Sequence, residues 1–481
     1  MTERLAVRGL EKMPTRVSGV DEVLQGGLPL GRATLLAGGP GTGKTLLALE
    51  MLYRGALAGE AGMFVTFEEP AESVRDNAAA MGWDLASLEA AGKLFVFHAE
   101  IPPGAILSGE FDIGGLLAIL GGKAQAMGAR LVVVDAIDVL LRVYQDRQLE
   151  QNELHKLHAW LRGRGLTGLI SAKMIEDGPS QPYPFLEYLS DCVIRLDQRV
   201  VEQVRTRRLR VLKYRGSGFL SNEYPYVILE GGIVLLPVSM TSLEYAAPGP
   251  RVSTGNAALD EISGGGYRQG TCVLVVGLSG TGKTTLVSTF AAAACGRGER
   301  VLYVSFEESA GSLISGMGNV GIGLGGWQER GLLTILTAMP EAAGVEEHLV
   351  RLFRTMDVVG PKHVVVDAIS ACRRMGSEVA AFDFLVRLLT RCKDRGITCL
   401  FTNQGSADIA QVEVSGLGIS SLVDVLVTLH YHEENGEMGR QVQVLKSRGS
   451  RHSTRRHRFR ITDGGMEVDA DGRFGARKGG R

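Results

Sequence analysis

The stretch GGPGTGKT at residues 38–45 returns as GLSGTGKT at residues 277–284. Both have the form GxxxxGK[ST], in which glycines let backbone N–H groups close around phosphates, the lysine reaches the β/γ oxygens and the hydroxyl ligates Mg²⁺. Each lies between an apolar strand-like run and a helical run, as a phosphate loop requires. One match alone could be an ordinary glycine turn, but two in the same context predict ATP sites. The predicted nucleotide-binding residues are Gly41, Thr42, Gly43, Lys44, Thr45 and Leu46, then Gly280, Thr281, Gly282, Lys283, Thr284 and Thr285.

Three further blocks recur in the same order, which indicates a tandem duplication. FVTFEEP at 64–70 returns as YVSFEES at 303–309, LVVVDAID at 131–138 as VVVDAIS at 364–370, and LKYRGS at 212–217 as LKSRGS at 445–450. Between the copies, EYAAPGPRVSTG at 244–255 has the composition of an exposed linker. The sequence therefore predicts two domains, 1–246 and 247–481.

Within each copy, short β-rich runs alternate with helical stretches, a pattern typical of a mostly parallel sheet covered by helices on both faces. The late segments 193–216 and 427–449 differ, because each consists of two alternating polar and apolar strands around a turn. We predict an α/β fold in which an antiparallel hairpin extends each sheet.

Composition limits the class of protein. The 481 residues contain 52 Lys and Arg against 53 Asp and Glu, so the formal net charge of −1 does not favour a nucleic-acid or membrane coat. No apolar run is long enough to span a bilayer, and the charged start is unlike a signal peptide. Six scattered cysteines without a CxxC pair are expected to be buried apolar residues. These features predict a soluble cytoplasmic protein.

Two aspartates that end apolar runs are candidate metal ligands. Asp135 and Asp367 follow the phosphate loops at the position where a strand-end carboxylate holds Mg²⁺, so we predict metal contacts with them and with Thr45 and Thr284. The alternative is a capping aspartate after an ordinary strand.

Two pairs of adjacent acids also follow strands and are candidate catalytic groups. Glu68 and Glu69, like Glu307 and Glu308, can orient or deprotonate the group that attacks the γ-phosphate. Glu307 is additionally a predicted metal contact. Acids on a solvated loop are the alternative interpretation.

Basic residues crowd both late hairpins. Such runs are commonly a solvated strand face or a nucleic-acid patch. In a ring of phosphate-loop domains, a Lys-x-Arg can instead reach the nucleotide of the neighbouring subunit. On this interpretation, which requires an oligomer, Lys213 and Arg215, and Lys446 and Arg448, contact nucleotide.

From about Leu10 to Glu467 the chain resembles the KaiC family of circadian clock proteins, in the RecA-like group. The resemblance rests on GGLPLGRATLLAGGPGTGKT, VTFEEP, GWDL, LKYRGS with NEYPY, SGTGKTT, SFEES, LFTN, GISSLVD and GEMGRQVQVLKSRGS. It implies a homohexameric double ring with ATP at subunit interfaces. It further implies slow ATP hydrolysis in the first domain, and autokinase and autophosphatase activity in the second.

The resemblance also implies a pair of phosphoacceptors, which GISSLVD offers as Ser420 and Ser421. Asp424 lies 22 residues before Lys446, as Asp191 lies 22 residues before Lys213, so the serines correspond to Glu187 and Tyr188. The first copy therefore lacks equivalent acceptors. The implied roles are Glu307 as the base, with Lys446 and Arg448 steadying the transferred charge. Simple turn residues are the alternative for the two serines.

The second copy departs from the first at residues 311–326. There, glycines replace a helix and an aromatic residue, Trp83, that could cover the nucleotide. Glycine costs about 1 kcal/mol in a helix relative to alanine, so we expect a mobile loop. The implied partners are a KaiB-like protein or a histidine kinase with its response regulator. Regulation by KaiA is not favoured, because little chain follows residue 467.

Two other functions remain open. One is a RecA/RadA-like nucleic-acid-dependent ATPase, which the basic hairpins would suit, although the chain has no four-cysteine zinc module and few aromatics among its basic runs. The other is a scaffold that binds ATP without turnover.

Overall fold

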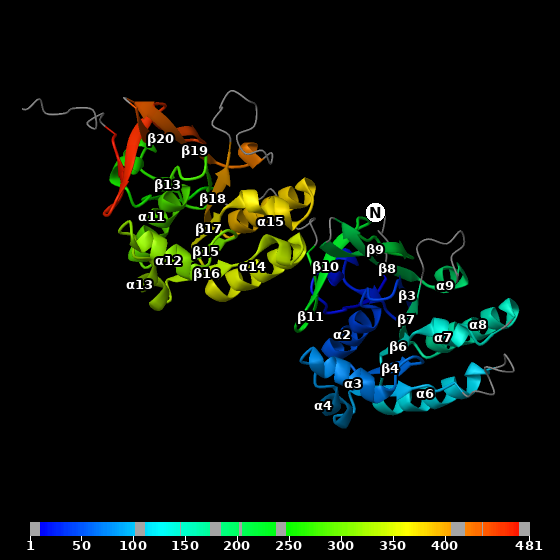
Figure 1. The fold of residues 1–481 in the computed structure, drawn as a ribbon. Coiled ribbons are helices and arrows are strands. Elements are labelled where there is room, and N and C mark those ends of the chain that lie inside the picture. Colours follow the sequence, from blue (N-terminus) through cyan, green and yellow to red (C-terminus); the bar gives the residue numbers. More distant parts are fainter. Residues whose placement is uncertain are drawn as a thin grey trace, which may run out of the picture. The chain divides into compact units, whose positions relative to one another are not determined.

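A computed structural model describes residues 10–101, 111–144, 146–173, 184–201, 204–236, 247–405, 419–434 and 436–470. These residues form two compact units, each built on its own nine-stranded sheet (Figure 1). The predicted boundary at 246 borders residues 237–246, which lie outside the described residues. Its position therefore stays a prediction.

The sheet of the first unit is mostly parallel. A central block of six strands runs parallel, and the last three strands are added antiparallel at one edge. The order along the sheet is β11 (Gly232–Leu235), β10 (Tyr224–Leu229), β9 (Val204–Tyr214), β8 (Cys192–Val201), β3 (Ala33–Gly38), β7 (Thr167–Lys173), β6 (Leu131–Asp135), β4 (Gly62–Thr66) and β5 (Leu94–His98).

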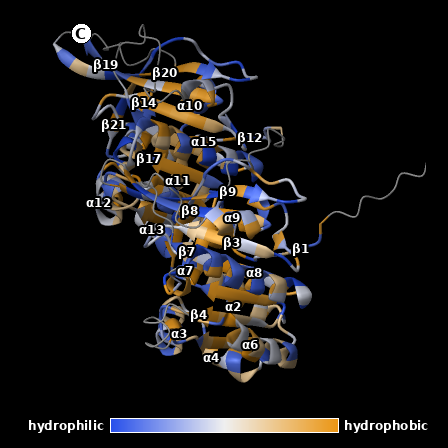
Figure 2. Ribbon diagram, turned by 90° about the vertical axis from the view of Figure 1, so that its right-hand side faces the viewer, coloured by the Kyte–Doolittle hydropathy of each residue, from blue (hydrophilic) through white to orange (hydrophobic). Residues whose placement is uncertain are grey.

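Helices cover both faces of this sheet because alternate side chains of each strand point to opposite sides. Leu36 of β3 packs in one core and its neighbour Leu35 in another. The helices are α1 (Val20–Val23), α2 (Lys44–Leu57), α3 (Ala71–Ala80), α4 (Leu85–Ala90), α6 (Ile113–Met127), α7 (Ile137–Leu141), α8 (Arg147–Gly163) and α9 (Pro184–Leu189), and a small sheet pairs β1 (Lys12–Met13) with β2 (Leu28–Pro29). Figure 2 shows apolar residues gathered along the central strands.

The second unit repeats this topology strand for strand. The order along its sheet is β22 (Gly465–Val468), β21 (His457–Thr462), β20 (Glu437–Ser447), β19 (Val425–Glu434), β14 (Cys272–Gly277), β18 (Thr398–Gln404), β17 (His363–Asp367), β15 (Val301–Ser305) and β16 (Leu333–Thr337). The helices are α10 (Ala257–Ile262), α11 (Lys283–Gly296), α12 (Ala310–Gly318), α13 (Leu324–Glu329), α14 (Val345–Val359) and α15 (Glu378–Asp394), with η2 (Pro340–Ala342), η3 (Ile369–Met375), η4 (Ile419–Ser421) and the pair β12 (Arg251–Val252) and β13 (Tyr267–Arg268). The predicted duplication, α/β class and late antiparallel hairpins are confirmed.

Two expectations about the segment after the paired acids are wrong. Residues 311–326 contribute to helices α12 and α13 rather than to a loop. Ser309 caps α12 by accepting a hydrogen bond from the Ser312 backbone N–H, and Leu313 is buried in the core. This burial outweighs the helix-propensity cost of the glycines. Trp83 does not cover the nucleotide site, because it is 4% exposed and stacks on Tyr53 of α2 with ring centroids 5.6 Å apart.

All six cysteines are free thiols and buried, as predicted. Of the helices that the structure describes, none combines the length and apolar character needed to span a lipid bilayer.

Candidate nucleotide and phosphotransfer sites

Each phosphate loop joins the central strand of its sheet to a long helix, β3 to α2 and β14 to α11. Gly43 and Gly282 close the two loops with φ of 87° and 99°, a conformation that favours glycine. A Cβ on Gly43 would lie 2.8 Å from Ile228, and one on Gly282 would lie 2.9 Å from Ile461. The loop backbone therefore requires glycine at both positions.

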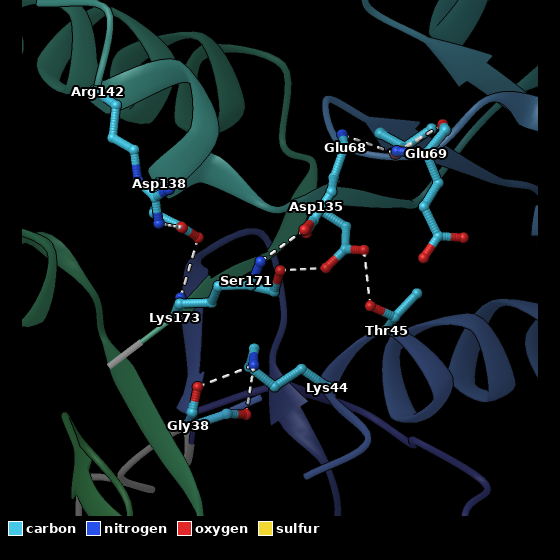
Figure 3. Close-up of polar contacts among 12 residues, drawn as sticks. Gly38, Lys44, Thr45, Glu68, Glu69, Asp135, Asp138, Arg142, Ser171 and Lys173 are labelled. Atoms are coloured by element: carbon cyan, nitrogen blue, oxygen red, sulfur yellow. Dashed lines mark hydrogen bonds and ion pairs between the residues drawn. The ribbon is translucent and has the colours of Figure 1, made fainter. Parts of the chain in front are cut away.

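The loop lysines point into their own loops. Lys44 Nζ donates hydrogen bonds to the carbonyls of Gly38 at 2.8 Å and Gly39 at 2.9 Å (Figure 3). Lys283 Nζ makes the equivalent bonds in the second loop at 3.0 and 2.9 Å. Burial lowers the pKa of both lysines, and nearby carboxylates oppose this shift. Each cradle thus holds an ammonium group where phosphate oxygens would bind.

The other predicted loop residues contribute backbone shape. The buried hydroxyls of Thr42 and Thr281 donate to loop carbonyls at 2.9 and 2.8 Å. Leu46 of α2 packs against the core, and Thr285 of α11 is buried. Gly41 and Gly280 lie in the first and second phosphate loops, and Thr284 is the second residue of α11.

In the first domain, the predicted metal ligands lie together. Asp135 Oδ2 accepts a hydrogen bond from Thr45 Oγ1 at 2.9 Å, and Oδ1 accepts one from Ser171 Oγ (Figure 3). Burial raises the pKa of Asp135, although these hydrogen bonds oppose the rise. A carboxylate and a hydroxyl in contact beside a phosphate cradle are hard oxygen ligands, so the residues fit Mg²⁺.

The second domain holds its aspartate differently. Asp367 Oδ2 accepts a hydrogen bond from the buried Tyr303 hydroxyl at 2.9 Å, and Oδ1 accepts one from Thr402. Within the part of the chain that the structure describes, Thr284 makes no hydrogen bond to Asp367. Sequence reasoning missed Tyr303, Thr402 and Ser171. Their position on strands beside the aspartate strand was the available signal.

The paired acids separate into two environments. Glu68 Oε1 lies 2.6 Å from Lys173 Nζ, whereas Glu69 accepts a hydrogen bond from Asn77 of α3 at 3.1 Å. Glu68, and not Glu69, is among the charges that shift the pKa of Lys44. Lys173 lies in register with Gly38 of the phosphate loop, so its contact with Glu68 favours Glu68 as the acid that faces the loop.

The same distinction holds in the second domain. Glu307 shifts the pKa of Lys283, whereas Glu308 accepts a hydrogen bond from Ser312 at 3.4 Å. Burial raises the pKa of Glu307, and Asp367 adds to the rise. No cation lies within ion-pairing distance of Glu307 among the described residues. A cavity of about 660 Å³ opens beside it, lined also by Thr337, Met339 and Arg374.

The hairpin lysines hold the segments that precede β8 and β19. Lys446 Nζ donates to the carbonyls of Ser420 at 3.0 Å and Ser421 at 3.5 Å, and Arg448 donates to Ser421. In the first domain, Lys213 Nζ donates to the backbone carbonyls of Glu187 at 2.6 Å and Tyr188 at 3.2 Å, and Arg215 donates to the Tyr188 carbonyl at 3.0 Å. These matching contacts agree with the correspondence between the serine pair and Glu187 with Tyr188.

These basic groups and serines lie at the amino ends of the parallel strands, whereas their own phosphate loop lies at the carboxyl ends. The Asp424 backbone N–H donates to Cys272, the first residue of β14, at 2.9 Å, whereas the phosphate loop follows the last residue of β14. Five residue steps of about 3.3 Å separate the two ends of β14 by roughly 17 Å. Asp191 likewise meets Ala33 at the start of β3. A single domain therefore cannot bring Lys446, Arg448 or the serines to its own phosphate loop.

Comparison with known proteins agrees with this architecture. A family model described as "ATPase: KaiC" matches residues 13–239 and 252–473. The chain belongs to the KaiC family. It is 37% identical over 472 residues to the circadian clock protein KaiC2 of Synechocystis sp., an alignment that covers 97% of this chain and 83% of the relative. It is 35% identical over 464 residues to the circadian clock oscillator protein KaiC of Synechococcus elongatus, covering 96% and 89%.

Membership of this family makes the chain a KaiC-family ATPase with nucleotide-binding domains. The two copies in the family match correspond to the two structural repeats. The roles of individual residues stay predictions.

Proposed function

We propose that this protein is a KaiC-like ATPase whose second domain is also a serine autokinase and autophosphatase, acting as a timing or signalling hub. One observation carries the proposal. Only the second domain has serines, Ser420 and Ser421, at the two positions where the Lys-x-Arg of the hairpin donates hydrogen bonds to backbone carbonyls. The first domain has Glu187 and Tyr188 there, so self-phosphorylation belongs to the second domain and simple hydrolysis to the first.

In the first domain, Lys44 and the loop N–H groups bind the ATP phosphates. Thr45 and Asp135 hold Mg²⁺, which neutralises charge on the β- and γ-phosphates when bound. Glu68 orients the water that attacks the γ-phosphate, and Glu69 contacts α3 through Asn77.

In the second domain, Lys283 binds the phosphates, and Thr284 and Asp367 are the residues that would hold Mg²⁺. Glu307 accepts the proton of the serine hydroxyl as the serine oxygen bonds to the γ-phosphorus, and the bond from the γ-phosphorus to the ADP oxygen breaks, so that ADP leaves. Burial raises the pKa of Glu307 and thus its affinity for that proton. Removing such a positioned base typically lowers the rate by a factor of about 10²–10⁴. The cavity beside Glu307 offers room for an incoming serine segment.

The acceptor serines must come from another subunit. They lie roughly 17 Å along the strands from their own phosphate loop. Transfer therefore requires an oligomer in which the amino ends of the strands of one subunit meet the carboxyl ends of the strands of its neighbour. A homohexameric ring satisfies this requirement, and Lys446 and Arg448 then approach the neighbour's nucleotide together with the serines. Lys213 and Arg215 do the same in the first domain.

Phosphorylation would also act as the signal. Each phosphoserine adds about −1.5 to −2 charges beside Lys446 and Arg448 at a subunit boundary, which alters ring packing. A KaiB-like protein, or a histidine kinase with its response regulator, would detect that change.

Steady-state ATP hydrolysis tests the enzyme assignment. The parent protein should turn over ATP, and the Glu68→Gln plus Glu69→Gln variant should lose most of this turnover. A scaffold that only binds ATP would show no turnover to lose. Hydrolysis stimulated strongly by DNA, with a steep dependence on salt, would instead favour a recombinase-like motor.

A further inference from the structure

The two domains differ in the residue that ends the strand beside the phosphate loop, and the proposed function gives this residue no role. In the first domain, Lys173 at the end of β7 pairs in register with Gly38, the carbonyl of which binds Lys44. In the second domain, the equivalent residue is Gln404, in register with Gly277. A cation thus stands beside the first phosphate loop at a position where the second loop has an amide.

The backbone of Lys173 is anchored while its side chain reaches an acid. Its N–H donates to Asp138 Oδ1 at 3.0 Å, and the fully buried Asp138 carboxylate is also bonded by Arg142 at 3.1 Å (Figure 3). Its ammonium lies 2.6 Å from Glu68 Oε1. In the second domain Ser370 replaces Asp138, and Arg374 pairs with Glu341. The whole network is therefore particular to the first domain.

This ion pair is easily exchanged. The Lys173 and Glu68 side chains are 31% and 46% exposed, and an ion pair of that exposure typically contributes only about 0–1 kcal/mol. The charge of Lys173 also reaches Lys44, since it is among the causes that lower the Lys44 pKa. A γ-phosphate held by Lys44 would carry more negative charge than one carboxylate and would compete with Glu68 for Lys173.

We propose that Lys173 is a γ-phosphate-sensing residue of the first domain, which exchanges the Glu68 carboxylate for the γ-phosphate of ATP. Without a γ-phosphate, Lys173 is ion-paired with Glu68, the acid that must orient water. With ATP bound, the exchange releases Glu68 beside the phosphate that is to be attacked. ADP has no group to complete the exchange, so the first domain discriminates ATP from ADP through Lys173. The inference rests on the proposed nucleotide site of this domain.

Equilibrium binding to the full chain tests the inference without requiring turnover. A Lys283→Ala background removes the second site, and ADP and a non-hydrolysable ATP analogue are titrated in the presence of Mg²⁺. Lys173→Gln installs the residue that the second domain has at this position. It should weaken binding of the analogue about tenfold or more and change ADP affinity far less. Glu68→Gln should have the opposite effect and tighten binding of the analogue, because Lys173 then has no carboxylate partner to exchange.

Lys156→Gln is the matched control, because Lys156 of α8 is also an ion-paired lysine, with Asp112 and Glu153 as its partners. It should leave both affinities unchanged. Equal weakening of ADP and the analogue by Lys173→Gln, or shifts of the same sign for Lys173→Gln and Glu68→Gln, would overturn the inference and reduce the pair to a structural contact. Absence of any nucleotide binding in the background protein would overturn the proposed first-domain site as well.

Discussion

The hydroxyl of Tyr303 should hold the metal-site aspartate of the second domain. Tyr303→Phe removes one oxygen atom from a side chain with no measurable exposure and leaves Asp367 Oδ2 without its 2.9 Å partner. The first domain has Phe64 at the equivalent position, so phenylalanine suits this strand sterically.

The magnitude follows from the kind of bond that is lost. A hydrogen bond to a charged acceptor contributes about 1.5–3 kcal/mol, and burial leaves water little access to replace it. Tyr267 provides the matched control in the same domain, because it is 1% exposed and its hydroxyl has no hydrogen-bond partner among the described residues. Tyr267→Phe should therefore be neutral or slightly stabilising.

Urea unfolding monitored by Trp327 isolates the second domain. The chain has three tryptophans, and replacing Trp83 and Trp160 by phenylalanine leaves Trp327 of α13, which packs against the second-domain core. With a slope near 2 kcal/mol per molar urea, a loss of about 2 kcal/mol lowers the midpoint by about 1 M. Equal midpoints for Tyr303→Phe and Tyr267→Phe would refute the view that Tyr303 stabilises Asp367.

Three further predictions follow from the same geometry. Glu307→Gln should lower phosphotransfer to the serines by about 10²–10⁴ while Glu308→Gln has a smaller effect, as measured by phosphopeptide mass spectrometry against time. Because burial raises the Glu307 pKa and the base must be ionised, phosphotransfer in the parent should decline as pH falls, beginning above the usual glutamate value of 4.5; a flat profile down to that value would contradict the assignment. Gly316→Ala in α12 should stabilise the second domain by about 0.5–1 kcal/mol, since a Cβ there meets nothing within 4 Å, and destabilisation on urea unfolding would argue against the helix.

The features that could be predicted from the sequence depend on local backbone requirements. A phosphate loop needs glycines with positive φ between a strand and a helix, so Gly43 and Gly282 are visible in the pattern itself. Their recurrence with Asp135 and Asp367 also indicates the duplication.

The features that were missed depend on contacts between residues that are far apart in the sequence. Tyr303 and Phe64 both read as apolar strand residues, and only tertiary structure brings the Tyr303 hydroxyl to Asp367, 64 residues away. Lys173 lies in a block that differs between the copies, so comparison of repeats did not select it. Helix α12 was missed because glycine propensity is a local quantity, whereas the burial of Leu313 is not.

Phosphosite mapping after incubation with Mg-ATP tests the central claim most directly. Phosphate should appear on Ser420 or Ser421 in the parent and in the Glu68→Gln plus Glu69→Gln variant, and should be lost in Glu307→Gln plus Glu308→Gln. An active preparation without phosphate on either serine, or one in which the first-domain variant alone loses the label, would contradict a division of labour between a hydrolysing first domain and a self-phosphorylating second domain.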